Sequence, residues 1–449
     1  MPEGHAAGPA APPPDPASLI RSRRFIGVLV LAALVGLVAS LAAWAFLELV
    51  HQIEVGVFYD GAPTWWPLPV LAVAGLIVAF AIVRLPGTGG HVPAHGLNPG
   101  VTQPIELPGV ILAAIATIGL GVVLGPEAPL IALGGGLGLL GVRLVRGDAS
   151  AELGTILAAS GTFAAVSLIF DSPLVAAVIL IEATGLGGPK LPLVLIPGLL
   201  AAGIGSLVSI GMGSFTGLST SAYSLGALTL PAFSRPDIAD FGWTIALAIA
   251  VAAGVVVVVR FACRVEQVVT GRAFVALPAA GLVIAGLAIA FSQITGKGAD
   301  EVLFSGQDQL QGLITNGAGW SLATLALLLA CKGVGWAISL AGFRGGPTFP
   351  AMFLGVAAGL MASHLPGFPL TPAISVGMAA AIVAMLRLPL SAVVLTTVLT
   401  SKGGLGASPL IIVGVVVAYV TTLVLTRPRA AAEPVPAAPQ PTTVTGVSD

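Results

Sequence analysis

Apolar runs broken by glycine and proline fill most of this chain, and they limit its fold more than any other feature. The runs lie at about 25–50, 66–85, 107–124, 128–146, 152–170, 172–184, 190–213, 241–263, 274–293, 320–341, 349–365, 372–386, 388–400 and 407–426. A helix needs about 20 residues to cross a membrane, and several of these runs are shorter or contain some of the 59 glycines and 35 prolines. Irregular backbone at membrane depth is tolerated only where protein buries it or where it lines a water-filled cavity. The pattern therefore predicts broken and re-entrant helices that pack closely through small residues.

Composition places the chain in a membrane. The 449 residues are 56% hydrophobic and 8% charged, with a mean hydropathy of +1.04, whereas a soluble domain has about 25% charged residues. We therefore expect an all-α integral membrane protein that crosses the bilayer many times. A net charge of −1 gives no reason to expect a nucleic-acid partner. The basic stretch RSRR at 21–24 precedes the first run, which predicts a cytoplasmic N-terminus. The expected location is the cell inner (plasma) membrane.

The polar segments divide the chain into parts. Residues 1–24 and 428–449 are rich in proline and alanine and are expected to be disordered tails, the first of them cytoplasmic. The polar stretch 214–240 is expected to link two membrane repeats, at 25–213 and 241–427.

An internal duplication supports this division. GPEAPLIALG at 125–134 matches GPTFPAMFLG at 346–355 in both prolines and both flanking glycines, and DSPLVAAVIL at 171–180 is similar to RLPLSAVVLT at 387–396. Two motifs in the same order at similar spacing indicate a repeat. The odd number of apolar runs in each half implies that the two halves are inverted in the membrane.

Glu127 lies inside the first of these motifs, between Pro126 and Pro129. A carboxylate at bilayer depth costs about 2.5–3.5 kcal/mol, so its position needs a reason. A Gly-Pro break followed by a helix leaves unpaired N–H groups and a partial positive charge at the helix start, which favours an anion. Inverted-repeat transporters aim such half-helices at an anionic substrate near the midplane. We therefore predict an anion site at the two duplicated helix starts. Glu127 would be a tethered competitor for that site and hence a gate, although a cap with no gating role is the alternative.

The motifs resemble those of the CLC chloride channel and transporter family. GPEAP at 125–129 is similar to the family motif GxEGP, GFRGGPTFPAMFLG at 342–355 resembles the loop that carries GxFxP, and GGHVP at 89–93 is a weaker match to GSGIP. The resemblance extends over about residues 25–427. It implies transport of chloride or a similar monovalent anion, coupled to protons in some members, by a homodimer with one pathway in each subunit.

The resemblance also implies which residues hold the anion. Backbone amides of three loops are expected to form the site, with Glu127 as the gate. Thr348 stands where the family commonly has phenylalanine, and its hydroxyl is an added candidate ligand of this chain. The expected anion-binding residues are Gly89, Gly90, His91, Val92, Pro93, Gly125, Pro126, Ala128, Pro129, Gly345, Gly346, Pro347, Thr348, Phe349 and Pro350.

Several positions depart from the family pattern. Gly90 stands where the family has a coordinating serine, and the position of the coordinating tyrosine falls near Ala430, with Tyr419 the nearest tyrosine. The acidic pair that includes the internal proton relay falls on Glu182 and Ala183, and alanine at the relay position cannot carry a proton. This favours passive conduction. Exchange with protons by another route, for which Glu182 is the candidate, stays open, as do a packing role for Glu182 and selectivity for fluoride or nitrate.

Other classes of protein fit less well. An enzyme would need a nucleophile–base pair or a metal cluster, but the chain has five histidines and neither HExxH nor GxSxG. No cofactor or metal is expected, and the two cysteines are expected to be packing residues. A cation channel would need rings of carboxylates or carbonyls. Three basic residues in or near the membrane, Lys332, Arg344 and Arg387, are expected to pair structurally rather than to attract the anion directly.

Overall fold

The structure is a computed structural model, and it describes residues 22–97, 100–145, 151–185, 187–188, 191–217 and 224–426. Nine of the described helices are long and apolar enough to cross a membrane. They are α2 (Arg23–Val57), α3 (Pro67–Arg84), α5 (Glu127–Val145), α6 (Ala151–Ile169), α8 (Leu191–Thr216), α9 (Ile238–Val269), α10 (Ala273–Thr295), α12 (Leu322–Gly342) and α16 (Ser408–Leu425).

Shorter apolar helices complete the bundle. They are α4 (Leu107–Gly119), α7 (Pro173–Thr184), α13 (Thr348–Ala362), α14 (Leu370–Leu386) and α15 (Pro389–Leu399). Every apolar run expected from the sequence is a helix, so the predicted all-α membrane fold of broken helices is confirmed. One short helix, α11 (Gln309–Thr315), follows no apolar run and was not predicted.

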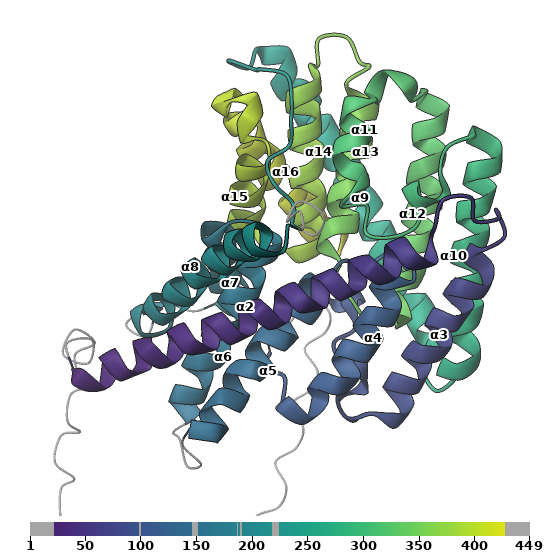
Figure 1. Cartoon of the computed structure of the whole chain (residues 1–449). Helices are drawn as coiled ribbons and strands as arrows, with labels where there is room; N and C mark the ends of the chain where they lie inside the picture. Colours follow the sequence, from purple (N-terminus) through teal and green to yellow (C-terminus); the bar gives the residue numbers. More distant parts are fainter. Residues whose placement is uncertain are drawn as a thin grey trace, which may run out of the picture.

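The long helix α2 crosses the bundle obliquely in front of α5 and α6 (Figure 1). Its 35 residues span about 50 Å at 1.5 Å per residue, which exceeds the roughly 30 Å hydrocarbon core of a bilayer. The length therefore requires α2 to tilt if its apolar side chains are to stay in the membrane.

Glycine contacts occur at equivalent places in the two halves. A Cβ on Gly161 of α6 would lie 2.1 Å from the carbonyl oxygen of Gly134 in α5, and a Cβ on Gly377 of α14 would lie 2.2 Å from that of Gly355 in α13. Gly134 and Gly355 close the two duplicated decapeptides, and Gly161 and Gly377 precede the prolines of α7 and α15 by the same number of residues. The repeat seen in the sequence is thus also a repeat of helix packing.

The turn before each of these prolines has the same unusual backbone. Asp171 and Arg387, each two residues before the proline, have φ values of 47° and 58°, in the left-handed region that non-glycine residues rarely adopt. The cap of α7 is Ser172 and not its neighbour Asp171: the Ser172 hydroxyl accepts a hydrogen bond from the backbone N–H of Val175 at 3.3 Å.

The segment that links the two halves forms backbone hydrogen bonds with both of them. Leu225 donates its backbone N–H to the carbonyl of Ile169 at the end of α6 (3.0 Å), and Leu228 donates to that of Leu399 at the end of α15 (2.7 Å). The division into repeats at 25–213 and 241–427 stays a prediction. The expected tails lie outside the described residues, except for 22–24, where α2 begins.

Candidate functional site

The starts of α5 and α13 meet through their preceding glycines. Gly125 donates its backbone N–H to the carbonyl of Gly346 at 2.8 Å, and Gly346 donates to the carbonyl of Gly125 at 2.6 Å. Each glycine stands just before the proline that opens its helix. The two duplicated Gly-Pro segments therefore converge at one point, with both helices leading away from it.

The carboxylate of Glu127 crosses from α5 to the start of α13. Its Oε1 accepts a hydrogen bond from the backbone N–H of Thr348, and the carboxylate also interacts with the N–H of Phe349. The side chain is 2% exposed. A Cβ on Gly346 would lie 1.9 Å from the carboxyl carbon, so only glycine leaves room for it. The carboxylate thus occupies the place at a helix start where a free anion would bind.

The supply of backbone donors at this point is limited. Four of the expected residues at the two helix starts are prolines and have no N–H, and Gly125 and Gly346 use theirs to bond to each other. The donors that face the carboxylate belong to Glu127 itself, Thr348 and Phe349. An anion entering this position would therefore compete with Glu127 for the same N–H groups.

Oε2 of Glu127 and Oγ1 of Thr348 are buried at the meeting point and make no hydrogen bond of good geometry, although the Thr348 hydroxyl faces the carboxylate. Most buried polar atoms in proteins are paired, and an exception calls for an explanation such as a water, an ion or a functional role. A proton, a water molecule or an ion at this point can supply the hydrogen-bond partner that each of the two oxygens lacks.

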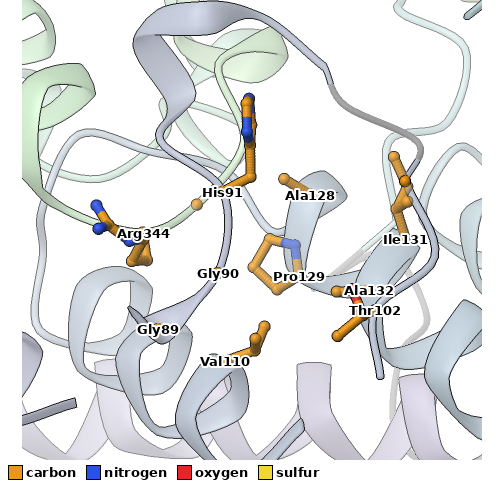
Figure 2. A pocket seen from close by; sticks show the side chains of 12 residues that line it. Gly89, Gly90, His91, Thr102, Val110, Ala128, Pro129, Ile131, Ala132 and Arg344 are labelled. Carbon is orange, nitrogen blue, oxygen red and sulfur yellow. The ribbon is translucent and has the colours of Figure 1, made fainter. Parts of the chain in front are cut away.

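A small cavity of about 50 Å³ lies next to this point and brings the three predicted loops together (Figure 2). Its lining includes residues from all three: Gly89, Gly90 and His91, then Ala128 and Pro129, then Arg344 and Gly345. Val92 and Pro93 were expected in the site but do not line the cavity; Pro93 is buried and begins the turn η2 (Pro93–His95).

His91 contributes a neutral side chain to the cavity. Burial lowers the pKa of His91 below its ordinary value. Its Nε2 lies 2.9 Å from the carbonyl oxygen of Gly96. His91 therefore adds polarity near neutral pH without a positive charge.

Arg344 joins the first loop to the third. Its Nε donates to the carbonyl of Thr88 at 3.2 Å, and its Nη1 donates to that of Gly342 at 2.9 Å. The side chain is 7% exposed, and no carboxylate of the described residues lies within 4.0 Å of its guanidinium. The expected structural pairing is thus made with backbone carbonyls, and the guanidinium places a positive charge beside the cavity. This arrangement was not predictable from the sequence, because carbonyl partners have no side-chain signature.

Glu182 is held at the start of α15. Its Oε1 accepts the backbone N–H of Leu390 at 2.9 Å, and its Oε2 accepts the N–H of Ser391 at 2.7 Å and the hydroxyl of Ser391 at 2.6 Å. The carboxylate therefore caps a helix of the other half, which agrees with the packing interpretation, although the partner is a helix start and not a basic side chain. Ala183 follows it in α7.

The other expected residues take no part in the described site. Tyr419 is partly buried against the hydrophobic core, and Ala430 lies outside the described residues. In the part of the chain that the structure describes, no group of three or more His, Cys, Asp or Glu side chains could hold a metal ion.

Known proteins with similar sequences are ion transporters by description. The putative ion-transport protein YfeO of Escherichia coli (strain SMS-3-5 / SECEC) is 29% identical over 366 residues, which cover 77% of this chain and 81% of the relative. The protein of the same name from Escherichia coli O1:K1 / APEC is 33% identical over 311 residues, covering 67% and 69%.

Solved structures share the fold. A slow cyanobacterial Cl⁻/H⁺ antiporter superposes with a TM-score of 0.71 at 18% identity, covering 89% of this chain and 94% of that one. A CLC-type fluoride/proton antiporter gives a TM-score of 0.65 at 15% identity, covering 88% and 95%. A family model described as voltage gated chloride channel matches residues 93–423. The fold and this match agree with the resemblance in the motifs: the chain is a multi-pass membrane protein of the voltage-gated chloride channel (CLC) family.

Proposed function

We propose that this protein carries chloride or a similar small monovalent anion across the membrane, along a path that the Glu127 carboxylate closes. The observation that carries the proposal is the position of that carboxylate, which accepts the N–H of Thr348 at the start of a helix from the other half. A carboxylate and a halide compete for the same donors at a helix start. Protonation of Glu127, or rotation of its side chain, frees these donors for the anion.

Electrostatics around the site favour an anion over a cation. Two helix starts converge there, each with a partial positive charge of about half a unit, and Arg344 adds a buried guanidinium beside the cavity. A buried positive charge whose hydrogen-bond partners are backbone carbonyls repels cations where the dielectric constant is low. Family membership supports the same choice.

We infer that conduction is passive. The internal relay position of the family falls on Ala183, which has no titratable group, and the neighbouring Glu182 is engaged by three hydrogen bonds at the start of α15. A carboxylate that three hydrogen bonds hold in place is poorly suited to move protons along a pathway.

Chloride/proton exchange by another route is the second candidate. It is supported by a chain of titratable side chains near the cavity: Nε2 of His95 lies 3.1 Å from Oε1 of Glu266, and the rings of His91 and His95 are 6.4 Å apart. Selectivity for another anion, such as fluoride, is a further form of the same proposal. The two solved structures with this fold are described as chloride/proton and fluoride/proton antiporters.

One experiment separates these candidates. Purified protein in chloride-loaded liposomes is held at a set membrane potential, and chloride efflux and external pH are recorded together. Chloride efflux without proton movement supports passive conduction, whereas protons driven uphill by chloride support exchange. No chloride movement, with fluoride moving instead, would redirect the proposal to fluoride. We also propose, from the family resemblance, a homodimer in the plasma membrane with one pathway in each subunit.

A further inference from the structure

The ammonium group of Lys332 is enclosed by backbone carbonyls. Lys332 lies in α12, and its side chain is fully buried. Four consecutive carbonyl oxygens accept hydrogen bonds from its Nζ: those of Glu301 at 3.0 Å, Val302 at 3.3 Å, Leu303 at 2.8 Å and Phe304 at 3.2 Å. The ring of Phe353 in α13 closes the remaining side, with its centroid 4.5 Å from Nζ.

This geometry fits a charged lysine. A neutral amine has two N–H donors and a lone pair that would face a carbonyl, whereas an ammonium has three donors and no acceptor. The aromatic face also attracts a cation. Among the described residues, no carboxylate lies within 4.0 Å of Nζ, so its direct partners are carbonyl dipoles and the ring, while the carboxylates of Asp300 and Glu301 act on it from farther away. Rings of backbone carbonyls are how proteins replace the water around a monovalent cation.

An unusual backbone conformation allows the four carbonyls to converge. Phe304 adopts a φ of 57°, in the left-handed region, and Gly306 has a φ of 86°. A Cβ on Gly306 would lie 2.6 Å from the ring of Phe353. The segment from Glu301 to Phe304 is therefore bent around one point, and the ammonium is at that point. Without a cation there, the four carbonyls would point toward one another in a site that protein buries.

The four carbonyls around Lys332 belong to a segment that is connected to both stretches of chain that meet at Glu127. Phe304 donates its backbone N–H to the carbonyl of Gly121 at 3.0 Å, and Gly121 begins the stretch that leads to Gly125. Phe353 lies about one turn beyond Phe349 in α13. Lys332 therefore links the approach to α5 with the first turns of α13.

We propose that the carbonyls of residues 301–304 form a monovalent-cation site of ammonium or potassium size, which the protein fills with its own Lys332 side chain. Occupation of this site holds the loop and α13 in the positions at which the two helix starts meet. Lys332 is thus a positioning residue for the gate. The flux readout below rests on the proposed function, whereas the stability readout does not depend on it.

The first test replaces the tethered cation by a free one. Lys332→Met keeps the length of the side chain and empties the site, so its thermal unfolding midpoint in N-methylglucamine chloride should fall by several degrees. Potassium or ammonium chloride should restore part of the lost stability, with an effect that saturates as the cation concentration rises. The cation that restores more stability should also raise chloride flux more. A matched control is Lys297→Met, because Lys297 has a cation–π contact with Trp320 but no carbonyl ring around it. The control and the wild type should not respond to the choice of cation.

The results test the cation site and the proposed function separately. If Lys332→Met is as stable as the wild type, or if potassium and ammonium shift it no more than they shift Lys297→Met, the cation site is disproved. If the cations restore stability in a protein that conducts no chloride, the site stands and the proposed function fails.

A second measurement covers the case in which Lys332→Met does not fold. Folded wild-type protein is treated with an amine-acylating reagent and the modified lysines are identified by mass spectrometry. Lys402, which is exposed, should react, and Lys332 should react only after unfolding. Equal reaction of both lysines in folded protein would overturn the proposal.

Discussion

No side chain fits between Gly346 and the carboxylate of Glu127, because a Cβ on Gly346 would lie 1.9 Å from the carboxyl carbon. The glycine belongs to the second half of the chain and the glutamate to the first. The space that the carboxylate occupies is therefore made jointly by the two halves, and both partners can be tested by substitution.

Replacement of the proposed gate, Glu127, by its neutral form is the most direct test. Glu127→Gln mimics the protonated acid and has no negative charge to compete with chloride at the helix start. We expect chloride flux in liposomes to become largely independent of pH, whereas wild-type flux should rise as the pH falls. A mutant that keeps the wild-type pH dependence would remove Glu127 from the gating role.

Gly346→Ala should show energetic coupling to Glu127. In the wild-type background the added methyl group collides with the carboxylate, and overpacking of this kind costs about 1–3 kcal/mol. In a Glu127→Ala background the collision is absent and the cost should largely disappear, which a double-mutant cycle of unfolding free energies would measure. Additive effects of the two substitutions would mean that the carboxylate does not lie over Gly346.

The glycine contacts between helices should be equally sensitive in both halves. Gly161→Ala and Gly377→Ala each place a methyl group about 2 Å from a carbonyl oxygen of the neighbouring helix, so each should destabilise the protein by about 1–3 kcal/mol. Gly286→Ala in α10 is the control, because a Cβ there meets no atom within 4 Å. Thermal unfolding in detergent compares the three, and a stable Gly377→Ala beside an unstable Gly161→Ala would contradict the repeat of packing.

Glu182 should behave as a helix cap and not as a proton carrier. Glu182→Ala leaves the first N–H groups of α15 without their acceptor, and the loss of such a cap costs about 0.5–2 kcal/mol. The ratio of proton to chloride movement in liposomes should stay as in the wild type. If the mutant loses proton movement while its unfolding midpoint is unchanged, Glu182 belongs to a proton route instead.

The pH dependence of stability should include a contribution from Glu301. Burial, with help from the negative charge of Asp300, raises the pKa of Glu301 from 4.5 to about 7. The folded state therefore binds this proton more tightly than the unfolded state does. The resulting stabilisation is complete below about pH 4.5 and is lost as the pH rises through about 7. Glu301→Gln should reduce the loss of stability between about pH 5 and about pH 8. The control Glu152→Gln, at an exposed position, should leave the loss of stability over this pH range unchanged.

The parts of the structure that follow from local chemistry were predictable from the sequence. A Gly-Pro pair before an apolar run begins a helix because proline lacks the donor that a helix start leaves unused, and this located the starts of α5 and α13. The duplicated motifs then predicted two related halves. Membrane helices also follow from apolar length alone, which explains why each expected run is a helix.

The contacts that could not be predicted from the sequence join residues that are distant in the chain or involve backbone groups. Glu182 bonds to Ser391, 209 residues away, and no pattern near either residue records that contact. Arg344 and Lys332 bond to backbone carbonyls, which every residue has, so their surroundings leave no trace in the sequence. The reciprocal bonds of Gly125 and Gly346 follow from the register in which the two loops meet, which tertiary packing sets.

Those reciprocal bonds also restrict how the pathway can open. A rigid-body rocking of one half against the other at this point would break both hydrogen bonds between Gly125 and Gly346 at once. Rotation of the Glu127 side chain breaks neither of them. Under the proposed function, the backbone therefore stays still while one side chain moves, and the speed of opening would be set by a rotamer change and a proton and not by the movement of domains.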